Sequence, residues 1–162
     1  MIKYKPKPHL KDFDYLGCYR YFVTICTDRK KNIFANNDYL LEKISEVLAQ
    51  SAERNYFKVW LYCYMPDHLH LLVEGINDQA DLKKFIKDFK QRTGYWYTHK
   101  EAHTGNKLWQ PGYYEHVLRK EEDTKEIMLY ILNNPVRKGL VESYLDYRYS
   151  GSLRGSRDLI CT

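Results

Sequence analysis

Two histidines separated by one leucine are the residues of this chain best suited to chemistry. His68 and His70 stand in the run His68–Val73, which is apolar apart from the imidazoles and follows the turn signal Pro66-Asp67. The run predicts a buried β-strand, and because side chains alternate along a strand, both imidazoles share one face. Two neutral imidazoles at this spacing can hold a divalent metal ion. One structural and one surface histidine would fit the pair equally well.

A tyrosine and an asparagine late in the chain form the second candidate group. The segment from Glu121 to Asn134 predicts a helix that Pro135 ends and that Asp123 can cap. On such a helix Tyr130 and Asn134 lie four residues apart and are neighbours on one face. Since the chain has 16 tyrosines, spacing alone does not select a nucleophile, and Tyr130 by itself fits a core position.

Further strands and helices must position these residues. Tyr19–Thr27, Phe57–Tyr64 and Tyr113–Leu118 predict strands, the second of which pairs with the histidine strand as an antiparallel hairpin. Amphipathic helices are predicted from Asn37 or Asp38 to about Asn55, and from Asp78 to about Tyr97. The order strand, helix, strand, strand, helix, strand, helix predicts an α+β fold, a ferredoxin-like sandwich of an antiparallel sheet and packed helices. Many functions share this architecture, so the fold does not decide the activity.

Length and composition favour one globular domain. A chain of 162 residues with 44% hydrophobic residues can bury a sizeable core. We expect a basic, irregular N-terminal arm over residues 1–18, a folded domain over residues 19–141 that would carry any catalysis, and a C-terminal tail over residues 142–162. No apolar stretch approaches about 18 residues, so no transmembrane helix is expected. The lysine-rich start also lacks the apolar core of a signal peptide.

Charge and cysteine content narrow the partners and the compartment. A net charge of +5 and a pI near 8.9 favour a polyanionic partner, although many basic proteins bind no nucleic acid. Cys18, Cys26, Cys63 and Cys161 form no Cys-X-X-Cys pair. They are typical of reduced thiols in a cytoplasmic protein rather than of a disulfide or zinc framework.

Three sequence blocks occur in an order that resembles a known enzyme family. The first, PDHLH, begins at Pro66, the second, LWQPGYYEHVLR, at Leu108, and the third, YILNNPVRKGLV, at Tyr130. Together they resemble the single-tyrosine transposases of the His-hydrophobic-His superfamily. Within it, the chain is most similar to the REP-associated tyrosine transposases and to those of small insertion sequences. The resemblance runs from about Tyr19 to Val141, and the three ordered blocks are more specific than the histidine pair alone.

The resemblance implies a reaction and a role for each matching residue. The family cleaves and rejoins single-stranded DNA, often at a hairpin, with Mg²⁺ or Mn²⁺, and works as a monomer or a homodimer. By position, His68 and His70 match the metal ligands, and Tyr130 matches the nucleophile that forms a 5′-phosphotyrosine. Asn134 matches the polar residue that completes the metal site. Related transposases often have glutamine there, so Asn134 keeps the carbonyl oxygen but shortens its reach.

Basic and aromatic side chains are candidates for binding the DNA. Lysines and arginines neutralise phosphates, and exposed aromatic rings stack on bases. Ordinary solvation of the charges and core packing of the rings remain alternatives. The candidate DNA-binding residues are Arg29, Lys30, Lys83, Lys87, Lys90, Trp109, Tyr114 and Arg119. His116, in the second block, is expected to support the core or the site rather than to bind metal.

Two other functions fit parts of the sequence. A non-catalytic single-stranded nucleic-acid-binding module could stack bases on a ferredoxin-like sheet, and its binding would survive both EDTA and the loss of Tyr130. A metal-dependent hydrolase of small phosphoesters could use the histidine pair. However, the sequence shows no carboxylate-rich cluster, and two histidines are a sparse site for activating water. The tyrosine on the late helix favours the transposase.

Overall fold

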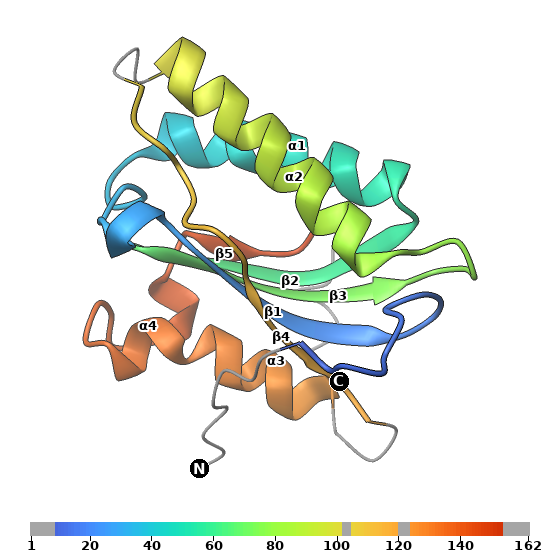
Figure 1. Ribbon diagram of the computed structural model, residues 1–162. Helices are drawn as coiled ribbons and strands as arrows, with labels where there is room; N and C mark the ends of the chain where they lie inside the picture. The colour runs from blue at the N-terminus through green and yellow to red at the C-terminus, as the bar shows by residue number, and fades with distance from the viewer. Residues whose placement is uncertain (1–8, 102–104, 120–123, 154–162) are drawn as a thin grey trace.

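The computed structural model describes residues 9–101, 105–119 and 124–153. An antiparallel sheet of five strands, in the order β4-β1-β3-β2-β5, lies between two layers of helices (Figure 1). The strands are β1 Arg20–Cys26, β2 Phe57–Met65, β3 His68–Gly75, β4 Tyr114–Val117 and β5 Ser150–Gly151. The chain order β1-α1-β2-β3-α2-β4, with strand order β4-β1-β3-β2, is ferredoxin-like. The predicted α+β class is therefore confirmed.

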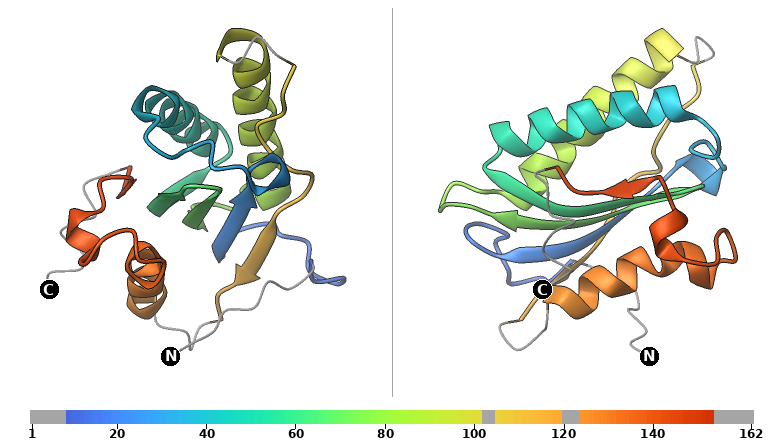
Figure 2. Two further views of the ribbon diagram at one scale, coloured as in Figure 1. Left: turned by 90° about the vertical axis from the view of Figure 1, so that its left-hand side faces the viewer. Right: turned by 180° about the vertical axis from the view of Figure 1, so that it is seen from behind.

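The helices divide between the two faces of the sheet. The longer helices α1 and α2 cover one face, and α3 and α4 lie against the other (Figure 2). The α-helices are α1 Asp38–Arg54, α2 Leu82–Trp96, α3 Thr124–Leu132 and α4 Asn134–Arg137. Shorter elements are the 3₁₀ turns η1 Asp28–Lys30 and η3 Tyr144–Asp146, and the π-helical turn η2 Tyr97–Glu101. Among the described residues, no helix has both the length and the apolar character to cross a membrane.

Side-chain caps fix where the two long helices begin. The Asn37 side chain accepts a hydrogen bond from the backbone N–H of Leu40, so α1 starts where the sequence predicts. The Asp81 side chain accepts from the N–H of Lys84, 3.1 Å away, and α2 therefore begins at Leu82. The predicted start at Asp78 was wrong because Asp81 is the residue that caps this helix.

Strand alternation creates two cores, one on each face. Leu69, Leu71 and Val73 of β3 point into the core beneath α1 and α2, whereas Leu72 joins the core beneath α3. The smaller core also holds the buried face of α3, formed by Ile127, Met128, Ile131 and Leu132. The two histidines of β3 are in phase with Leu72, so they lie on the α3 side of the sheet, as alternation requires.

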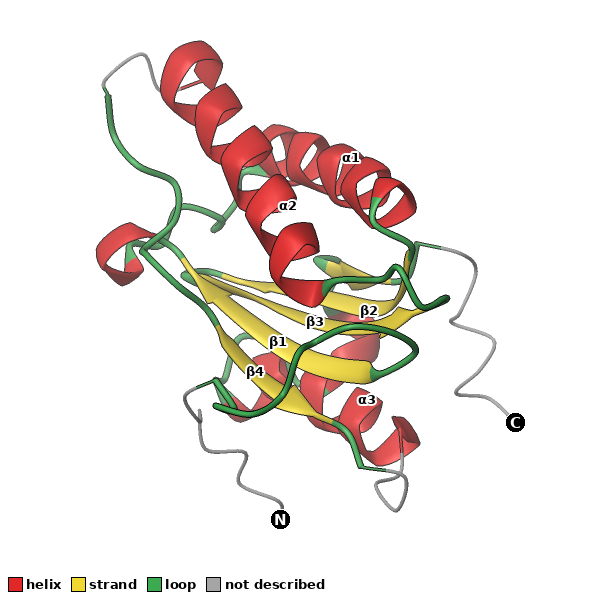
Figure 3. Cartoon of the chain, turned by 45° about the vertical axis from the view of Figure 1, so that its right-hand side comes forward, coloured by secondary structure: helices red, strands yellow, loops and turns green. Residues whose placement is uncertain are grey.

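Segments outside the predicted strands and helices also pack onto the sheet (Figure 3). Tyr15, in the expected N-terminal arm, is fully buried, while residues 1–8 lie outside the described residues. In the expected C-terminal tail, β5 pairs with the edge of β2, and the Tyr147 hydroxyl donates to the carbonyl of Tyr64, 2.6 Å away. Cys18, Cys26 and Cys63 are free thiols, and Cys161 lies outside the described residues, as does the expected helix cap Asp123.

Candidate active site

The two imidazoles of β3 face each other. Their rings are 4.6 Å apart between centroids at an interplanar angle of 77°, and the Nε2 atoms of His68 and His70 are 3.1 Å apart. Two ligand atoms at right angles around one ion, each about 2.1 Å from it, would be separated by about 3.0 Å. The spacing of the nitrogens thus fits shared coordination of one metal ion.

Hydrogen bonds at the opposite ring nitrogens fix this orientation. The Nδ1–H of His68 donates to Oδ1 of Asp67 at 2.6 Å, because a carboxylate can only accept. Nδ1 of His70 is 2.9 Å from the Thr24 hydroxyl on β1, which is the residue paired with it across the strands. Metal-binding histidines are commonly held in this way through the ring nitrogen that does not bind the metal.

Burial keeps both imidazoles uncharged. His70 is 7% exposed, and burial holds its pKa well below the usual 6.5, with the neighbouring His68 and the positive charge of Arg137 lowering it further. Burial also lowers the pKa of His68, although the hydrogen bond to Asp67 opposes the shift. Neutral imidazoles at pH 7 are the form that a metal ion binds.

Asn134 reaches the histidine pair from a different helix than the sequence predicts. Pro135 has no N–H to continue the helix, and its ring would clash with the preceding turn. As a result α3 ends at Leu132, and α4 begins at Asn134 with proline in its first turn. The prediction that Tyr130 and Asn134 share one helix was therefore wrong. Asn134 is nevertheless buried, with its Nδ2 in contact with Nε2 of His70.

The donor set fits a divalent metal ion. Among the described residues, no group of three or more His, Cys, Asp or Glu could hold one, so any third protein ligand beside the two imidazoles would be of another residue type. A half-turn of the Asn134 amide exchanges its nitrogen for its oxygen, which would complete a set of two nitrogens and one oxygen. Mn²⁺ accepts such mixed ligands, and Mg²⁺ usually keeps several waters beside few protein ligands.

Tyr130 lies on the same side of the sheet as the histidines. The ring of Phe22 on β1 is 5.2 Å from that of His70 and 6.0 Å from that of Tyr130, measured between centroids. The Arg137 guanidinium lies 4.1 Å from the centre of the Tyr130 ring and donates to the Tyr130 carbonyl at 2.9 Å. Arg137 is therefore close to the phenol, and its charge is felt by His70.

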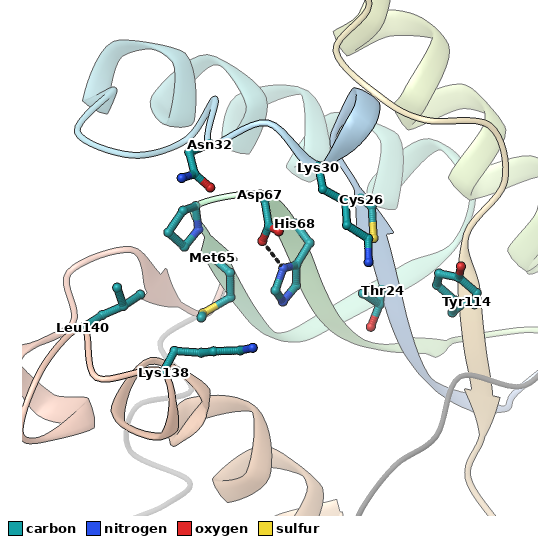
Figure 4. A pocket seen from close by; sticks show the side chains of 11 residues that line it. Thr24, Cys26, Lys30, Asn32, Met65, Asp67, His68, Tyr114, Lys138 and Leu140 are labelled. Atoms are coloured by element: carbon teal, nitrogen blue, oxygen red, sulfur yellow. Dashed lines mark hydrogen bonds and ion pairs between the residues drawn. The ribbon is translucent and has the colours of Figure 1, made fainter.

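A cavity of about 460 Å³ opens beside His68. Figure 4 shows Lys30 and Lys138 on different sides of this imidazole, and the charges of both lower its pKa. Tyr114, 40% exposed, forms part of the wall. Two of the predicted DNA-binding residues, Lys30 and Tyr114, thus border the candidate site.

Other predicted DNA-binding residues lie elsewhere. Lys83 and Lys87 are exposed on α2, which covers the opposite face of the sheet (Figure 1). Lys90, also on α2, uses its ammonium to bind the carbonyls of Gln110 and Gly112 at 2.9 and 2.5 Å.

The remaining three candidates differ in their exposure. Arg29 is exposed and 3.8 Å from the carboxylate of Asp28, and Arg119 is exposed just after β4. Trp109 is instead a core residue. It is 7% exposed, packs on Phe34, and donates from its indole N–H to Thr93 at 2.8 Å. An indole enclosed in this way has no free face on which a base could stack.

Sequence reasoning missed residues that support the site. Thr24 was unassigned because its partnership with His70 depends on the register of β1 against β3, which no local pattern reveals. The position of Asp67 directly before His68 could have indicated its role, since a carboxylate next to a metal-binding histidine can orient the imidazole ring. Arg137 and Lys138 form a basic pair after Pro135 that could have been added to the candidates. His116 is half-buried on β4, opposite Phe22 in the register.

Comparisons with known proteins show which family the chain belongs to. Residues 16–134 match the IS200-like transposase family. A Haemophilus influenzae protein assigned to the REP-associated tyrosine transposases is 30% identical over 148 residues, covering 86% of this chain and 82% of that protein. The REP-associated tyrosine transposase of Escherichia coli is 32% identical over 97 residues, covering 58% of this chain and 53% of that protein. The structure of a REP-associated tyrosine transposase bound to a REP hairpin shares the fold, with a TM-score of 0.71 and 20% identity, covering 94% of this chain and 86% of that one. The chain belongs to the IS200-like transposases.

Proposed function

We propose that this transposase cleaves and rejoins single-stranded DNA through Tyr130, with a divalent metal ion held by His68, His70 and Asn134. The observation that carries the proposal is the meeting of these groups on the α3 side of the sheet. The two Nε2 atoms face each other at 3.1 Å, the Asn134 amide contacts one of them, and the Tyr130 ring lies just beyond Phe22.

In the cleavage step the phenol oxygen of Tyr130 attacks the phosphorus of one phosphodiester. A bond from the phenol oxygen to phosphorus forms, and the bond from phosphorus to the 3′ oxygen breaks. The proton lost by the phenol is balanced by the proton that the departing 3′ oxygen gains. The products are a 5′-phosphotyrosine and a free 3′-hydroxyl. Since the number of phosphoester bonds is unchanged, attack by a 3′-hydroxyl on the phosphotyrosine rejoins DNA without an external energy source.

The surrounding side chains have separate tasks in this step. A bound divalent ion would polarise the phosphate and neutralise charge that develops during the displacement. The Asp67 carboxylate and the Thr24 hydroxyl hold the two imidazoles in their ligand orientation. The Arg137 guanidinium lies 4.1 Å from the centre of the Tyr130 ring and donates to the Tyr130 carbonyl, so it holds the tyrosine and brings positive charge to the place where the phosphate would lie.

A hairpin-containing single strand is the substrate that we infer. The chain is basic, with a net charge of +5, and a relative with the same fold was solved bound to a REP hairpin. Lys30 and Lys138 bring positive charge to the cavity beside His68, where a phosphate must approach the metal ion.

The non-catalytic alternative has less support. A module that binds only by stacking spreads two or three bases over an open sheet face, but α1 and α2 cover one face here and α3 lies against the other (Figure 2), which leaves room for a base only at the edge strand, where Tyr114 is 40% exposed. Trp109, one of the two aromatic residues predicted to stack on bases, is buried. The hydrolase alternative would need further ligands to activate water, and the described residues offer no carboxylate-rich cluster.

A covalent-adduct assay tests the proposal. The protein is incubated with Mn²⁺ and hairpin oligonucleotides that carry a label on the 3′ side of the flanking single strand. We expect a labelled protein band that resists denaturation, is lost with EDTA, and is absent from Tyr130→Phe. Tyr39→Phe, which alters an exposed tyrosine on α1, serves as the matched control and should retain the band. An adduct that persists in Tyr130→Phe would move the nucleophile to another tyrosine, such as Tyr113 or Tyr114.

A further inference from the structure

The cavity beside His68 has a wall of mixed chemistry. Its volume is about 460 Å³, within the range of about 300–1,000 Å³ that is typical of small-molecule sites. Met65 and Tyr114 line it with apolar and aromatic surface, while Lys30 and Lys138 line it with positive charge (Figure 4). A purely apolar ligand would leave the charges unused, and a bare phosphate would leave the aromatic surface uncovered.

We propose that this cavity holds one unpaired nucleotide next to the phosphate that is cut, with its base against Tyr114 and its phosphates between Lys30 and Lys138. The inference rests on the proposed function, because His68 both borders the cavity and binds the catalytic metal ion. It adds a nucleotide-binding site, which makes an unpaired base beside the cut a requirement of the substrate.

The size of the cavity selects a single nucleotide. The major groove of duplex DNA is already about 12 Å wide, so a double helix cannot enter a space of 460 Å³. A single base that no longer stacks on its neighbours can enter the cavity. Moving a base out of the stack costs the least free energy where the strand is already unpaired. The shape of the site therefore favours single-stranded over double-stranded DNA at the position of cleavage.

Tyr114 is placed to receive the base. It pairs with Thr24 across β1 and β4, and cross-strand partners project from the same face of a sheet. Thr24 also contacts His70, so the tyrosine stands on the face that carries the metal ligands. Its ring is 40% exposed, which leaves surface for stacking, whereas the buried Trp109 has none. Met65, 1% exposed, is a polarisable part of the same wall.

The two lysines are available to bind phosphate. Among the described residues, neither Lys30 nor Lys138 has a carboxylate within ion-pair distance. The acidic side chain on the wall, Asp67, is already bonded to His68. The two ammonium groups come from opposite ends of the domain sequence, one from η1 and one from the turn after α4, so a backbone phosphate between them would be held from two sides.

The backbone around Lys30 is held in an uncommon conformation. Arg29 and Lys30 have φ values of 54° and 52°, the left-handed region that side chains other than glycine rarely adopt. A strained backbone conformation persists only where the surrounding structure holds it in place. Such conformations are concentrated at ligand-binding sites and active sites. Here the turn directs the Lys30 side chain to the cavity, whereas Arg29 is not among its lining residues.

Photocrosslinking and affinity measurements test the nucleotide site without cleavage. The protein carries Tyr130→Phe, EDTA is present, and the probe is a short oligothymidine with one 5-iodouracil. We expect mass spectrometry to map the crosslink to Tyr114. Tyr114→Leu should weaken binding of the single strand about 5-fold to 100-fold, the range of one lost base–aromatic stack.

The lysines are tested through the salt dependence of binding. Replacing both Lys30 and Lys138 by methionine should lower the slope of log affinity against log salt by about 0.7, the contribution of the one phosphate held between them on a single strand. Lys43→Met on the outer side of α1 and Tyr39→Leu are the matched controls and should bind as the parent does. Binding of a blunt duplex should not change in any variant.

The possible failures point to different conclusions. Crosslinks confined to residues outside the cavity, together with unchanged affinity of Tyr114→Leu and of the double lysine variant, would overturn the nucleotide site. That result would leave a Tyr130 adduct in the cleavage assay unaffected. Conversely, a cavity crosslink without any Tyr130 adduct would overturn the proposed reaction and retain a single-strand-binding cavity.

Discussion

Acid is expected to destabilise the metal-free protein through His70. Burial holds the pKa of this imidazole well below the usual 6.5, whereas in the unfolded chain it takes up a proton near pH 6.5. Between these two pKa values the unfolded state binds one more proton than the folded state. The free energy of unfolding must therefore decrease as the pH falls below about 6.5. Well above that pH the His70 imidazole is neutral in both the folded and the unfolded protein. It then contributes no pH dependence to the free energy of unfolding.

The size of the effect follows from proton linkage. A difference of one bound proton changes the free energy of unfolding by about 1.4 kcal/mol per pH unit. Because the unfolded chain is only half protonated at pH 6.5, lowering the pH from about 6.5 to about 5.5 should remove about 1 kcal/mol through His70 alone. The pKa of His68 is also lowered by burial, so its contribution has the same sign. A loss of this size is a large share of the roughly 5–15 kcal/mol that stabilises a typical domain.

Urea unfolding at a series of pH values in EDTA measures the effect. Wild type and His70→Gln are compared, with His99→Gln as a control that alters an exposed histidine on η2. We expect the stability of His70→Gln to fall by about 1 kcal/mol less than that of wild type and of the control between pH 6.5 and pH 5.5. An equal decline in His70→Gln, or a wild-type stability that does not change below pH 6.5, would refute the assignment of this pH dependence to the buried imidazole.

Three further predictions address the supports of the site. Asp67→Asn should weaken Mn²⁺ affinity about 10-fold to 100-fold, measured by paramagnetic resonance titration, while Asp28→Asn, which removes the same charge without contacting an imidazole, should not. Trp109→Ala should lower the free energy of unfolding by about 3–5 kcal/mol, because the indole is 7% exposed; a loss below 1 kcal/mol in urea titration would contradict its place in the core. Lys90→Met should lower the protection of the segment around Gly112 from amide hydrogen exchange, because two hydrogen bonds to its carbonyls are lost; unchanged exchange there would show that these bonds do not order the segment.

Local patterns were enough to predict the order of the first strands and helices. The β-branched and aromatic run from Arg20 to Cys26 forms β1, and the turn at Pro66-Asp67 produces the β2–β3 hairpin. Local signals failed where several competed. Asp78 and Asp81 can each cap a helix, and only the tertiary structure selects Asp81. The β5 strand is two residues long, too short to show any alternation, so its pairing with β2 could not be predicted.

The candidate site shows the same division between local and long-range information. That His68 and His70 share a face follows from strand alternation alone. That their Nε2 atoms face each other depends on Thr24 and on the rotation that Asp67 imposes, which requires the register between strands. Lys138 reaches the cavity only because α4 turns beneath the sheet. A composition with 26 lysines and arginines offers no means of choosing it over the others.

The interruption between α3 and α4 explains how one short segment can serve both the nucleophile and the metal. An unbroken helix would fix the spacing and orientation of Tyr130 and Asn134 on one face. With the helix interrupted before Asn134, both side chains still face the sheet, Asn134 at His70 and Tyr130 near Phe22, and Arg137 lies over the Tyr130 ring. Two of the proposed metal ligands, His68 and His70, thus lie on the sheet, while Asn134 lies on α4 and the proposed nucleophile Tyr130 on α3. Replacing Pro135 would therefore change the position of the amide relative to the phenol, without altering any residue that takes part in the proposed reaction.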